Sequence, residues 1–438
     1  MLINIGIYLE NEELLRESRL SGLVREFVKT GIRCFLYLPE PVDTFAKLDA
    51  QYAVIRDEQQ GISLTDIREK EFIAREIEFC CKNKIDLILT DIPSILNKEQ
   101  EFNLPVIDLK QELRKRDSCK ECAGRTLKIL FEHYSLSDRY VVIDVGTNNV
   151  LLVWAVIING EIKVIHRASR ISAMGKNMRD GKLTKAGIER VKKILSDFMR
   201  LSEYFSRDII VLGTSCSRES DNINLVSDWL KSRYDIEYRI LSDEEEASLM
   251  GRANRNHFQE YRELILFDIG GGSTEFIYYQ GDKAVYQDSL RLGIRRLENL
   301  SNDKRVNRID YINKRLDQLP AGLLRDPALV GIGGTVTNIS AVKKGLIYYD
   351  SAEVHKSSLS RNDIEYYFNK FSSMELLDIA ELMPFEPLRA NVITTGLLIV
   401  RAIMDYFNQD IIYVSDFGIQ FGILEQIATA KTKGRIFP

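Results

Sequence analysis

The stretch Leu264-Ile-Leu-Phe-Asp-Ile-Gly-Gly-Gly-Ser-Thr-Glu-Phe-Ile-Tyr-Tyr279 places two apolar strands on either side of a short glycine-rich turn. Three consecutive glycines let the backbone approach a ligand closely, and successive N–H groups in such a turn form a concave site for anions. Asp268, at the end of the first strand, offers a hard oxygen ligand for a divalent cation. The stretch therefore predicts a phosphate-binding hairpin; the alternative is a glycine-rich hairpin bulge without a ligand.

An earlier stretch has the same plan: Tyr140-Val-Val-Ile-Asp-Val-Gly-Thr-Asn-Asn-Val-Leu-Leu-Val-Trp-Ala-Val-Ile-Ile158. Aligning Asp144 with Asp268, 124 residues apart, matches an apolar strand, the Asp, a Gly two residues later, a cluster of hydroxyl or amide side chains and a second apolar strand. We interpret this as an internal duplication. Two domains of this plan resemble the superfamily of actin, sugar kinases and heat-shock chaperone ATPases (ASKHA), which implies a duplicated actin-like, ribonuclease H-like two-lobe α/β fold.

A third glycine element, Gly331-Ile-Gly-Gly-Thr-Val-Thr-Asn338, follows a short apolar strand and is expected to begin a helix. Glycines at a helix N-terminus favour anions, although a tight strand-to-helix turn without a ligand would read the same way. Asp144 and Asp268 are the predicted metal ligands. The predicted phosphate-binding residues of the three elements are Gly146, Thr147, Asn148, Asn149, Gly270, Gly271, Gly272, Ser273, Thr274, Gly333, Gly334 and Thr335.

Segments between and after the two turns are more specific. Gly213-Thr-Ser-Cys-Ser-Arg-Glu-Ser-Asp-Asn222 resembles the Ala-Thr-Ser-Ala-x-Arg-x-Ala-x-Asn segment of the exopolyphosphatase / guanosine pentaphosphate phosphohydrolase (Ppx/GppA) family. Leu241-Ser-Asp-Glu-Glu-Glu-Ala-Ser-Leu-Met-Gly251 resembles its Ile-Ser-Gly-x-Glu-Glu-Ala-Arg-Leu segment. The resemblance spans Arg139 to Leu424, with further matching positions at Leu292-Gly293 and Arg295, Arg389-Ala390 through Gly396, and Val414-Ser415-Asp416 through Gly422.

The resemblance implies a hydrolase that removes the terminal phosphate from inorganic polyphosphate or guanosine pentaphosphate-type nucleotides. By motif position, Glu246 would be the general base that activates a water, and Arg218 would clamp phosphoryl oxygens with its planar fork. Glu275 is a second candidate for ordering the water or the metal. The four histidines show no ligand spacing, so the cation would be held by oxygen ligands, as Mg²⁺ or Mn²⁺ prefer.

Some residues also have plainer interpretations. Ser242 followed by Glu245 is a capping-box pattern, so the acidic cluster can simply begin a helix, which accounts for Glu245 but not for Glu246. Arg218 could be an ordinary surface arginine. The chain also departs from the family pattern, because an amide replaces a hydroxyl at Asn149 and an uncharged pair replaces a charged pair at Gln420-Phe421.

These departures leave a phosphate- or nucleotide-binding sensor with weak catalysis as one alternative function. An actin-like ATP-dependent kinase is another, since the three glycine elements fit it equally well. The Thr-Ser-x-x-Arg and Glu-Glu-Ala segments argue against the kinase.

Residues 1–109 lie outside this pattern and alternate predicted strands with predicted helices, which is typical of a Rossmann-like parallel sheet. The predicted strands are Leu2–Leu9, Arg33–Leu38, Ile85–Thr90 and Pro105–Leu109, and the predicted helices are Asn11–Thr30 and Asp66–Asn83. Lys84–Pro93 and Asn103–Ile107 faintly resemble the acceptor half of a GT-B glycosyltransferase. We expect this domain to bind a further ligand or a partner, or to be purely structural.

The expected organisation is a domain over 1–109, a charged connector over 110–137, lobe I over 138–262 and lobe II over 263–438, with the C-terminal helix packing back on lobe I. Because all the motifs follow Arg139, we expect the part from Asp138 onward to fold and hydrolyse without the extension.

Composition excludes several classes. A net charge of −4 over 438 residues gives no sign of nucleic-acid binding, and no apolar run is long enough to span a membrane. The N-terminus lacks the basic region and cleavage site of a signal peptide, and six scattered cysteines, with a single C-x-x-C at Cys119 and Cys122, form no disulfide framework. We expect a cytoplasmic protein, and a homodimer by resemblance to the family.

Overall fold

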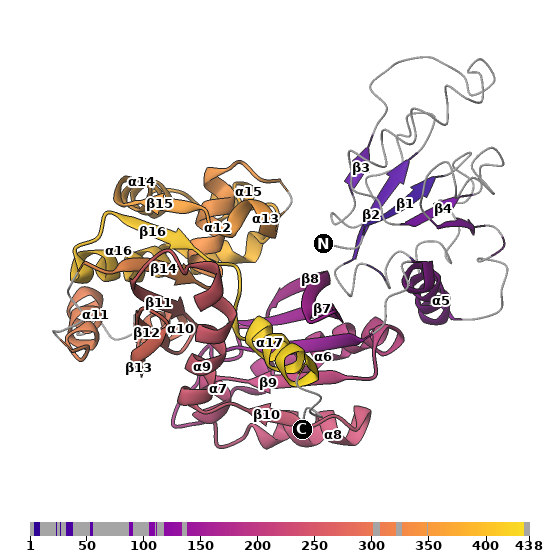
Figure 1. Cartoon of the computed structure of the whole chain (residues 1–438), viewed down its shortest axis with the longest axis horizontal. Helices are drawn as coiled ribbons and strands as arrows, with labels where there is room; N and C mark the ends of the chain where they lie inside the picture. The colour runs from indigo at the N-terminus through magenta and orange to yellow at the C-terminus, as the bar shows by residue number, and fades with distance from the viewer. Residues whose placement is uncertain are drawn as a thin grey trace, which may run out of the picture. The chain divides into compact units, whose positions relative to one another are not determined.

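The computed structural model describes residues 4–8, 23, 27, 32–37, 53–55, 87–90, 105–109, 111, 118–133, 138–300, 307–320, 326–347 and 349–432. Helices and strands are mixed along the chain, and the strands form three sheets (Figure 1). The chain divides into two compact units, one comprising Met1–Val141, Leu152–Ser169 and Leu195–Ile209 and the other Val142–Leu151, Arg170–Ile194 and Ile210–Pro438. In the described ranges, no helix is both long and apolar enough to cross a membrane.

The strands are β1 Asn4–Tyr8, β2 Arg33–Tyr37, β3 Ala53–Ile55, β4 Leu87–Thr90, β5 Val106–Asp108, β6 Arg139–Val145, β7 Asn149–Ile158, β8 Glu161–Ile171, β9 Ile209–Gly213, β10 Tyr238–Ile240, β11 Glu263–Ile269, β12 Thr274–Gln280, β13 Lys283–Leu290, β14 Ala328–Ile332, β15 Ser358–Ser360 and β16 Ile411–Val414. The helices are α5 Cys119–His133, α6 Lys185–Phe205, α7 Ser215–Arg218, α8 Asn224–Tyr234, α9 Asp243–Asn254, η3 Arg255–His257, α10 Ile294–Leu300, α11 Arg308–Leu316, α12 Gly334–Lys343, α13 Ser351–Val354, α14 Arg361–Ser372, α15 Leu376–Glu381, η5 Pro387–Asn391, α16 Ile393–Phe407 and α17 Ile419–Thr432.

The N-terminal strands form the predicted parallel sheet, in the order β3-β2-β1-β4-β5. The neighbouring residues Ile88 and Leu89 point to opposite faces of β4 and both are fully buried, so this sheet is covered on both sides. The sequence pattern did not identify β3. Leu23 and Phe27 are helical and buried, as the helix predicted over Asn11–Thr30 requires, while the helix predicted over Asp66–Asn83 falls outside the described residues.

The two later sheets confirm the internal duplication. One sheet, read from its other edge, runs β8-β7-β6-β9-β10, and the other runs β13-β12-β11-β14-β16-β15. If the edge strand β15 is set aside and the strands of each sheet are numbered from one to five along the chain, both sheets have the spatial order 3-2-1-4-5. The turns match in detail as well. Gly146 N–H donates to the carbonyl of Asn149 at 2.9 Å, and Gly270 N–H, 124 residues later, donates to the carbonyl of Ser273 at 3.0 Å.

Helix α5, which lies within the predicted connector, is part of a packed aromatic core. The ring of Phe131 meets the edge of Phe205 at 4.9 Å between centroids, and Phe205 stacks on the fully buried Trp154 at 4.9 Å. Farther along α5, a Cβ on Gly124 would overlap the ring of Tyr204, so the two helices that carry these residues approach closely. The residues 118–133 therefore belong structurally with β7 and α6 and are not a solvated linker.

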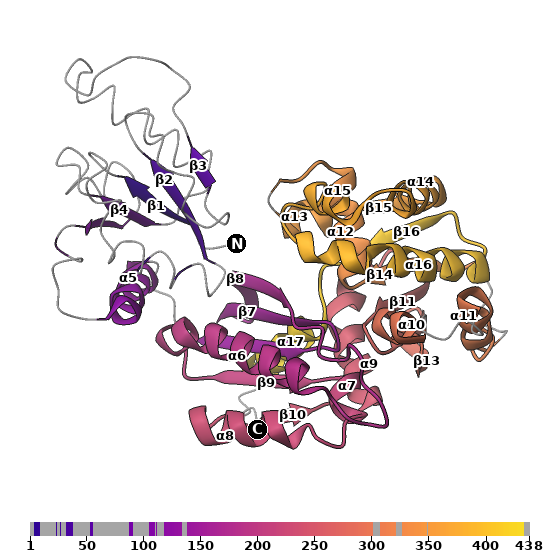
Figure 2. The ribbon, with the colours of Figure 1, turned by 180° about the vertical axis from the view of Figure 1, so that it is seen from behind.

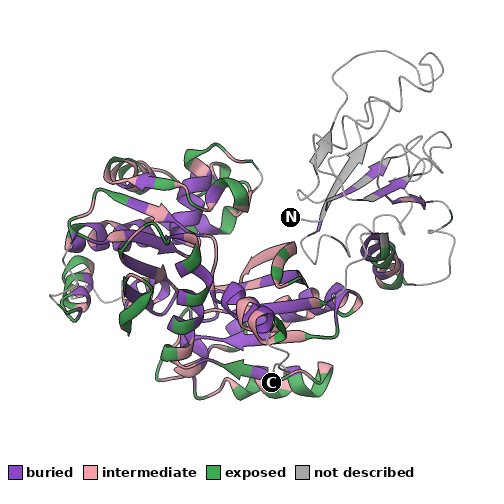
Figure 3. Ribbon diagram, viewed as in Figure 1, coloured by how far each residue is buried: buried purple, intermediate pink, exposed green. Residues whose placement is uncertain are grey.

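The central strand β11 of the six-stranded sheet is buried on both faces, because its neighbouring residues Leu264, Ile265, Leu266 and Phe267 are all buried. Buried residues line this part of the sheet in Figure 3. Leu264 and Leu266 belong to the same hydrophobic cluster as Met250 of α9 on one face, whereas Phe267 packs on the opposite face in the core that α12 and α16 cover (Figures 1 and 2). Helix α17 packs in turn on α9: a Cβ on Gly422 would overlap the backbone of Leu249. This packing fixes α9, the helix that carries Glu246.

Candidate active site

The two Asp-Gly turns lie directly against each other. A Cβ on Gly271 would lie 2.8 Å from Cβ of Thr147, and one on Gly272 would lie 2.5 Å from Oγ of Ser215. Any side chain at these two glycines would push the turns apart. Gly293 has a similar role, because a Cβ there would overlap the backbone of Gly271 and Gly272. The glycines are thus needed for the contact between the turns.

The apposed turns present unused hydrogen-bond donors. Across the described residues, the backbone N–H groups of five turn residues donate no hydrogen bond: Thr147, Asn148, Gly271, Gly272 and Ser273. Free N–H groups on successive turn residues are the chemical basis of an anion-binding nest. The turns are therefore equipped to hold the oxygens of a phosphoryl group.

The third glycine element begins α12 and contributes contacts of another kind. Gly333 has φ +86°, a conformation that favours glycine, and a Cβ there would collide with Oδ1 of Asp268. Gly334 is covered by the guanidinium of Arg389, which a Cβ would overlap. Both predicted residues therefore lie at the site, one against a predicted metal ligand and the other against a buried arginine.

Three carboxylates lie near one another at the strand ends. Asp268 and Glu275 are directly opposite in the β11–β12 ladder, which puts their side chains on one face. Burial, followed by the negative charges of Glu275 and Asp144, raises the pKa of Asp268 to about 8. Burial also raises the pKa of Asp144 to about 7, against a hydrogen bond from Gln420 and with a further contribution from Glu275. No positive side chain contributes to the pKa of Asp144 or Asp268, whereas Arg218 partly offsets the charge of Glu275.

The donor set fits a divalent cation. Oδ1 of Asp144 is buried and has no hydrogen-bond partner, and no described residue donates a hydrogen bond to Asp268. Carboxylates whose pKa is raised by burial and, to a lesser extent, by neighbouring negative charge, and which keep oxygens without a protein donor, are the surroundings that a hard cation stabilises. The described ranges hold no cluster of three or more His, Cys, Asp or Glu side chains in metal-binding arrangement. A cation here would therefore take two carboxylates from the protein, with substrate oxygens and water as its other ligands.

Glu246 and Arg218 form a buried ion pair. Nη1 of Arg218 donates to Oε2 of Glu246 at 2.6 Å and to the carbonyl of Leu241 at 2.8 Å, and Nη2 pairs with Asp243. Burial, and then the negative charge of Glu275, raise the pKa of Glu246 well above its ordinary value, while Arg218 opposes the shift. The structure thus brings the three predicted catalytic side chains together. It also commits the guanidinium of Arg218 to carboxylates, which makes Arg218 the partner of Glu246 and leaves it little capacity to clamp a substrate.

The neighbouring Glu245 has the role predicted for it. Ser242 Oγ accepts from the Glu245 N–H at 3.1 Å, and Glu245 accepts from the Ser242 N–H at 2.9 Å, so the capping box at the start of α9 is complete. The side chain of Glu245 is 44% accessible and also pairs with Arg239. Two adjacent glutamates therefore face different surroundings, one on the surface and one in the carboxylate cluster.

The remaining predicted residues divide into two groups. Asn148 accepts from Nε of Arg295 at 2.5 Å, and Asn149 donates to Glu386 at 3.2 Å, so both amides bind protein groups at the site. Thr274 and Thr335, by contrast, are fully buried, and the hydroxyl of Thr274 donates to the carbonyl of Leu292. The buried hydroxyl of Thr335 has no hydrogen-bond partner among the described residues.

Sequence reasoning assigned no role to several residues that the structure places here. Gln420 Nε2 donates to Oδ2 of Asp144 at 2.8 Å, across 276 positions of sequence. Glu386 joins Asn149 to Asn338, whose Nδ2 donates to it at 2.9 Å. The signal for Gln420 was present, because it stood out as a departure from the family pattern, but no pattern indicates that its partner is Asp144.

Two histidines that showed no ligand spacing in sequence are also brought together. Nε2 of His355 lies 3.4 Å from Nδ1 of His257, and Phe417 stacks on His355 at 4.2 Å between centroids. Burial lowers the pKa of His257.

Comparison with known proteins agrees with these features. The sequence profile of the Ppx/GppA phosphatase family matches residues 154–430. The chain is 29% identical over 376 residues to the bifunctional 3-dehydroquinate synthase/phosphatase of Fusobacterium nucleatum, a match that covers 80% of this chain and 56% of that protein. It is 26% identical over 318 residues to exopolyphosphatase 2 of Mycobacterium tuberculosis, covering 66% of this chain and 98% of that one.

The Aquifex aeolicus Ppx/GppA enzyme has a similar structure, with a TM-score of 0.53, 25% identity, and coverage of 66% of this chain and 99% of that chain. The Fusobacterium match also reaches beyond the duplicated lobes. Its 80% share of 438 residues is about 350, more than the 300 residues from Arg139 to Pro438, so the similarity includes residues ahead of Arg139.

Proposed function

The chain belongs to the Ppx/GppA phosphatase family, and on this premise we propose that it hydrolyses phosphoanhydride bonds, removing the terminal phosphate of a polyphosphorylated substrate. One observation carries the proposal above the others. Two glycine turns with free N–H groups stand beside a buried cluster of carboxylates that contains the Glu246–Arg218 pair. An anion-binding nest next to a poised base is what in-line attack of water on a phosphoryl group requires.

In the proposed mechanism, Glu246 accepts a proton from a water as the water oxygen forms a bond to the terminal phosphorus. The anhydride P–O bond breaks, and its electron pair leaves with the shortened phosphate chain. The raised pKa of Glu246 suits a base that works near neutral pH. Arg218 holds Oε2 of Glu246 at 2.6 Å and so fixes the carboxylate in place.

The turn residues supply charge stabilisation. The N–H groups of Thr147, Gly271 and Gly272 would donate to the phosphoryl oxygens, which carry the developing charge of the transition state. Asp144 and Asp268 would hold Mg²⁺ or Mn²⁺, and a bound divalent cation supplies electrostatic neutralisation of the phosphate oxygens. Glu275, held by the hydroxyls of Ser273 and Ser289 at 2.5 and 2.9 Å, stays fixed as the third carboxylate.

Inorganic polyphosphate and guanosine pentaphosphate-type nucleotides are the proposed substrate classes, by analogy with the family. The test is phosphate release measured by a malachite-green assay with Mg²⁺, over pyrophosphate, tripolyphosphate, long polyphosphate, guanosine pentaphosphate and ATP. We expect release from at least one substrate with three or more linked phosphates, in the absence of any acceptor. Binding without release would favour a sensor, and consumption of ATP only in the presence of an acceptor would favour a kinase.

A second prediction concerns the extension. The sequence alone suggested that a chain starting at Asp138 would suffice, but such a chain lacks α5, whose Leu127, Leu130 and Phe131 are buried. Each large buried side chain contributes about 2–5 kcal/mol, so this chain should unfold at least about 10 °C below the full protein or aggregate. A chain starting at residue 112, ahead of the Ser118 cap of α5, should keep both the melting temperature of the lobes and the phosphate release.

Thermal unfolding and phosphate release on both truncated chains check this prediction. If the chain that starts at residue 112 folds but releases no phosphate, the extension contributes directly to the active site. If the chain that starts at Asp138 has the same melting temperature as the chain that starts at residue 112, α5 is not an essential part of the core.

A further inference from the structure

We propose that the pocket beside the two turns binds the third phosphoryl group of the substrate, counted from the end that is cleaved, and that Arg295 is its principal contact. The inference deepens the proposed function and rests on it, because it selects substrates that carry linked phosphates beyond the terminal pair. It also separates two roles, cleavage at the carboxylates and retention of the rest of the polyanion at the arginine.

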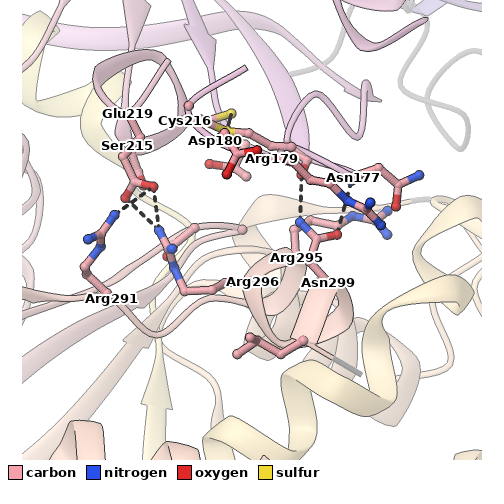
Figure 4. A pocket seen from close by; sticks show the side chains of 17 residues that line it. Asn177, Arg179, Asp180, Ser215, Cys216, Glu219, Arg291, Arg295, Arg296 and Asn299 are labelled. Atoms are coloured by element: carbon pink, nitrogen blue, oxygen red, sulfur yellow. Dashed lines mark hydrogen bonds and ion pairs between the residues drawn. The ribbon is translucent and has the colours of Figure 1, made fainter. Parts of the chain in front are cut away.

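The pocket has a volume of about 520 Å³ and is continuous with the predicted phosphate turns, since Thr147, Gly271 and Gly272 line it (Figure 4). This volume is in the range of small-ligand sites. Its wall carries four arginines, Arg179, Arg291, Arg295 and Arg296, against two acidic residues, Asp180 and Glu219, a formal charge of +2. The pocket is therefore basic although the whole chain is acidic, which is the local field that an anionic ligand needs.

Two of the four arginines are already paired within the protein. Glu219 accepts two hydrogen bonds from Nη2 of Arg296, at 2.6 and 2.8 Å, and pairs with Arg291 at 3.3 Å (Figure 4). Nε of Arg296 also donates to the Gly272 carbonyl at 2.7 Å. These contacts explain the positions of Arg291 and Arg296 without a ligand.

Arg295 differs from them. It is 93% buried, yet it has no carboxylate partner among the residues that the structure describes. Its Nε donates to Oδ1 of Asn148 and its backbone N–H donates to the Gly271 carbonyl at 2.7 Å, so the side chain is held against both turns. The two Nη atoms remain without a protein acceptor in the same described part. A buried guanidinium is costly unless something compensates its charge.

The neighbours of Arg295 increase that cost. Burial lowers the pKa of Arg295, and the positive charges of Arg389 and Arg190 lower it further, with Glu298 opposing. A bound phosphoryl group would offset this excess of positive charge and accept hydrogen bonds from the free Nη edge, which is planar and suited to two phosphate oxygens. The arrangement thus points to an anion that the protein itself does not provide.

Arg295→Met tests the assignment, because it keeps the length of the side chain and removes the charge and the fork. Arg401→Met is the matched control: Arg401 is a partly buried arginine of α16 that pairs with Glu365 at 3.5 Å and lines no part of the pocket. The probe is inorganic tripolyphosphate. Its binding is measured by calorimetry without a divalent cation, and KM and kcat for its hydrolysis are measured with Mg²⁺.

We expect Arg295→Met to weaken tripolyphosphate binding and to raise KM by about 10- to 100-fold, with kcat changed much less, because hydrogen bonds to charged groups contribute on this scale. KM for pyrophosphate, which has no third phosphate, should change by less than about threefold, and Arg401→Met should leave all values unchanged. Arg295→Lys should be intermediate, and it serves as the test if the Met variant does not fold.

Unchanged binding and KM in a folded Arg295→Met protein, or an equal loss for pyrophosphate and tripolyphosphate, would overturn the subsite. A wild-type protein that binds tripolyphosphate through Arg295 but hydrolyses no phosphoanhydride would leave the subsite standing and refute the proposed function. If the wild-type protein hydrolyses phosphoanhydrides and Arg295→Met has the same binding and KM, the proposed function stands and the subsite is refuted.

Discussion

Glu246→Gln is expected to lower kcat by about 10²- to 10⁴-fold, the usual contribution of a general base. The amide keeps the size of the side chain and can still meet Arg218, but it cannot take the proton of the attacking water. KM should change little, because the substitution removes a negative charge beside an anionic substrate without removing a donor. Steady-state phosphate release on the purified variant, with its melting temperature recorded in parallel, gives the measurement.

Glu245→Gln is the matched control, since it changes the adjacent carboxylate in the same way. Glu245 lies on the surface in the capping box, so its substitution should cost about 1 kcal/mol of stability at most and leave kcat within about twofold of wild type. If Glu245→Gln abolishes turnover while Glu246→Gln retains it, the catalytic carboxylate is misassigned. If neither variant loses activity, the base lies elsewhere.

Removal of divalent cations is the second large effect. EDTA should reduce phosphate release to background, and excess Mg²⁺ or Mn²⁺ should restore it, because Asp144 and Asp268 present carboxylate oxygens with too little positive charge around them. Full activity in EDTA would show that the pair does not act through a metal. Asp144→Asn should raise the Mg²⁺ concentration needed for half-maximal activity by at least about tenfold, since one charged ligand is lost.

The cation requirement should also depend on pH in a defined direction. The pKa values of Asp144 and Asp268 rise from 3.8 when unperturbed to about 7 and about 8, so in the absence of metal both are protonated in mildly acidic solution. Protons then compete with Mg²⁺, and the half-maximal Mg²⁺ concentration should fall as pH rises from 6 to 8.5.

Stability should follow the same linkage. Groups with raised pKa favour the folded state below their unfolded pKa and lose that contribution as pH rises through their folded pKa. The metal-free protein should therefore lose melting temperature between about pH 4 and 8 relative to Asp144→Asn, and the stabilisation by Mg²⁺ should grow as pH rises through about 7 to 8, where the two carboxyls lose their protons. Thermal scans with and without Mg²⁺ at both ends of this range measure the effect; an Mg²⁺ shift that does not vary with pH would contradict it.

Local patterns predicted much of this architecture. The two Asp-Gly hairpins, the duplication and the N-terminal parallel sheet follow from apolar runs and glycine positions, because hairpin and strand signals are local in sequence. The capping box at Glu245 is of the same kind, since it depends on residues three positions apart. These features need no knowledge of the tertiary structure.

The partners of the site residues could not be predicted in this way. Arg218 was expected to bind phosphate, but its position beside Glu246 and Asp243 is fixed by how α7 packs near the start of α9. The hydrogen bond from Gln420 to Asp144 joins residues 276 positions apart. The place of α5 in an aromatic core was also hidden, because the charged residues that precede it make that part of the chain read as a solvated connector.

The matched hydrogen bonds of the two turns have a consequence for the symmetry of the site. Along the sequence, the 124-residue offset of the duplication matches the position of Glu275 with Leu151 and that of Gly271 with Thr147. The backbone frame is therefore present twice, whereas the third carboxylate is present once. The frame can thus offer backbone donors from both halves, but only the second half adds an acid, because Leu151 supplies none at the position that matches Glu275.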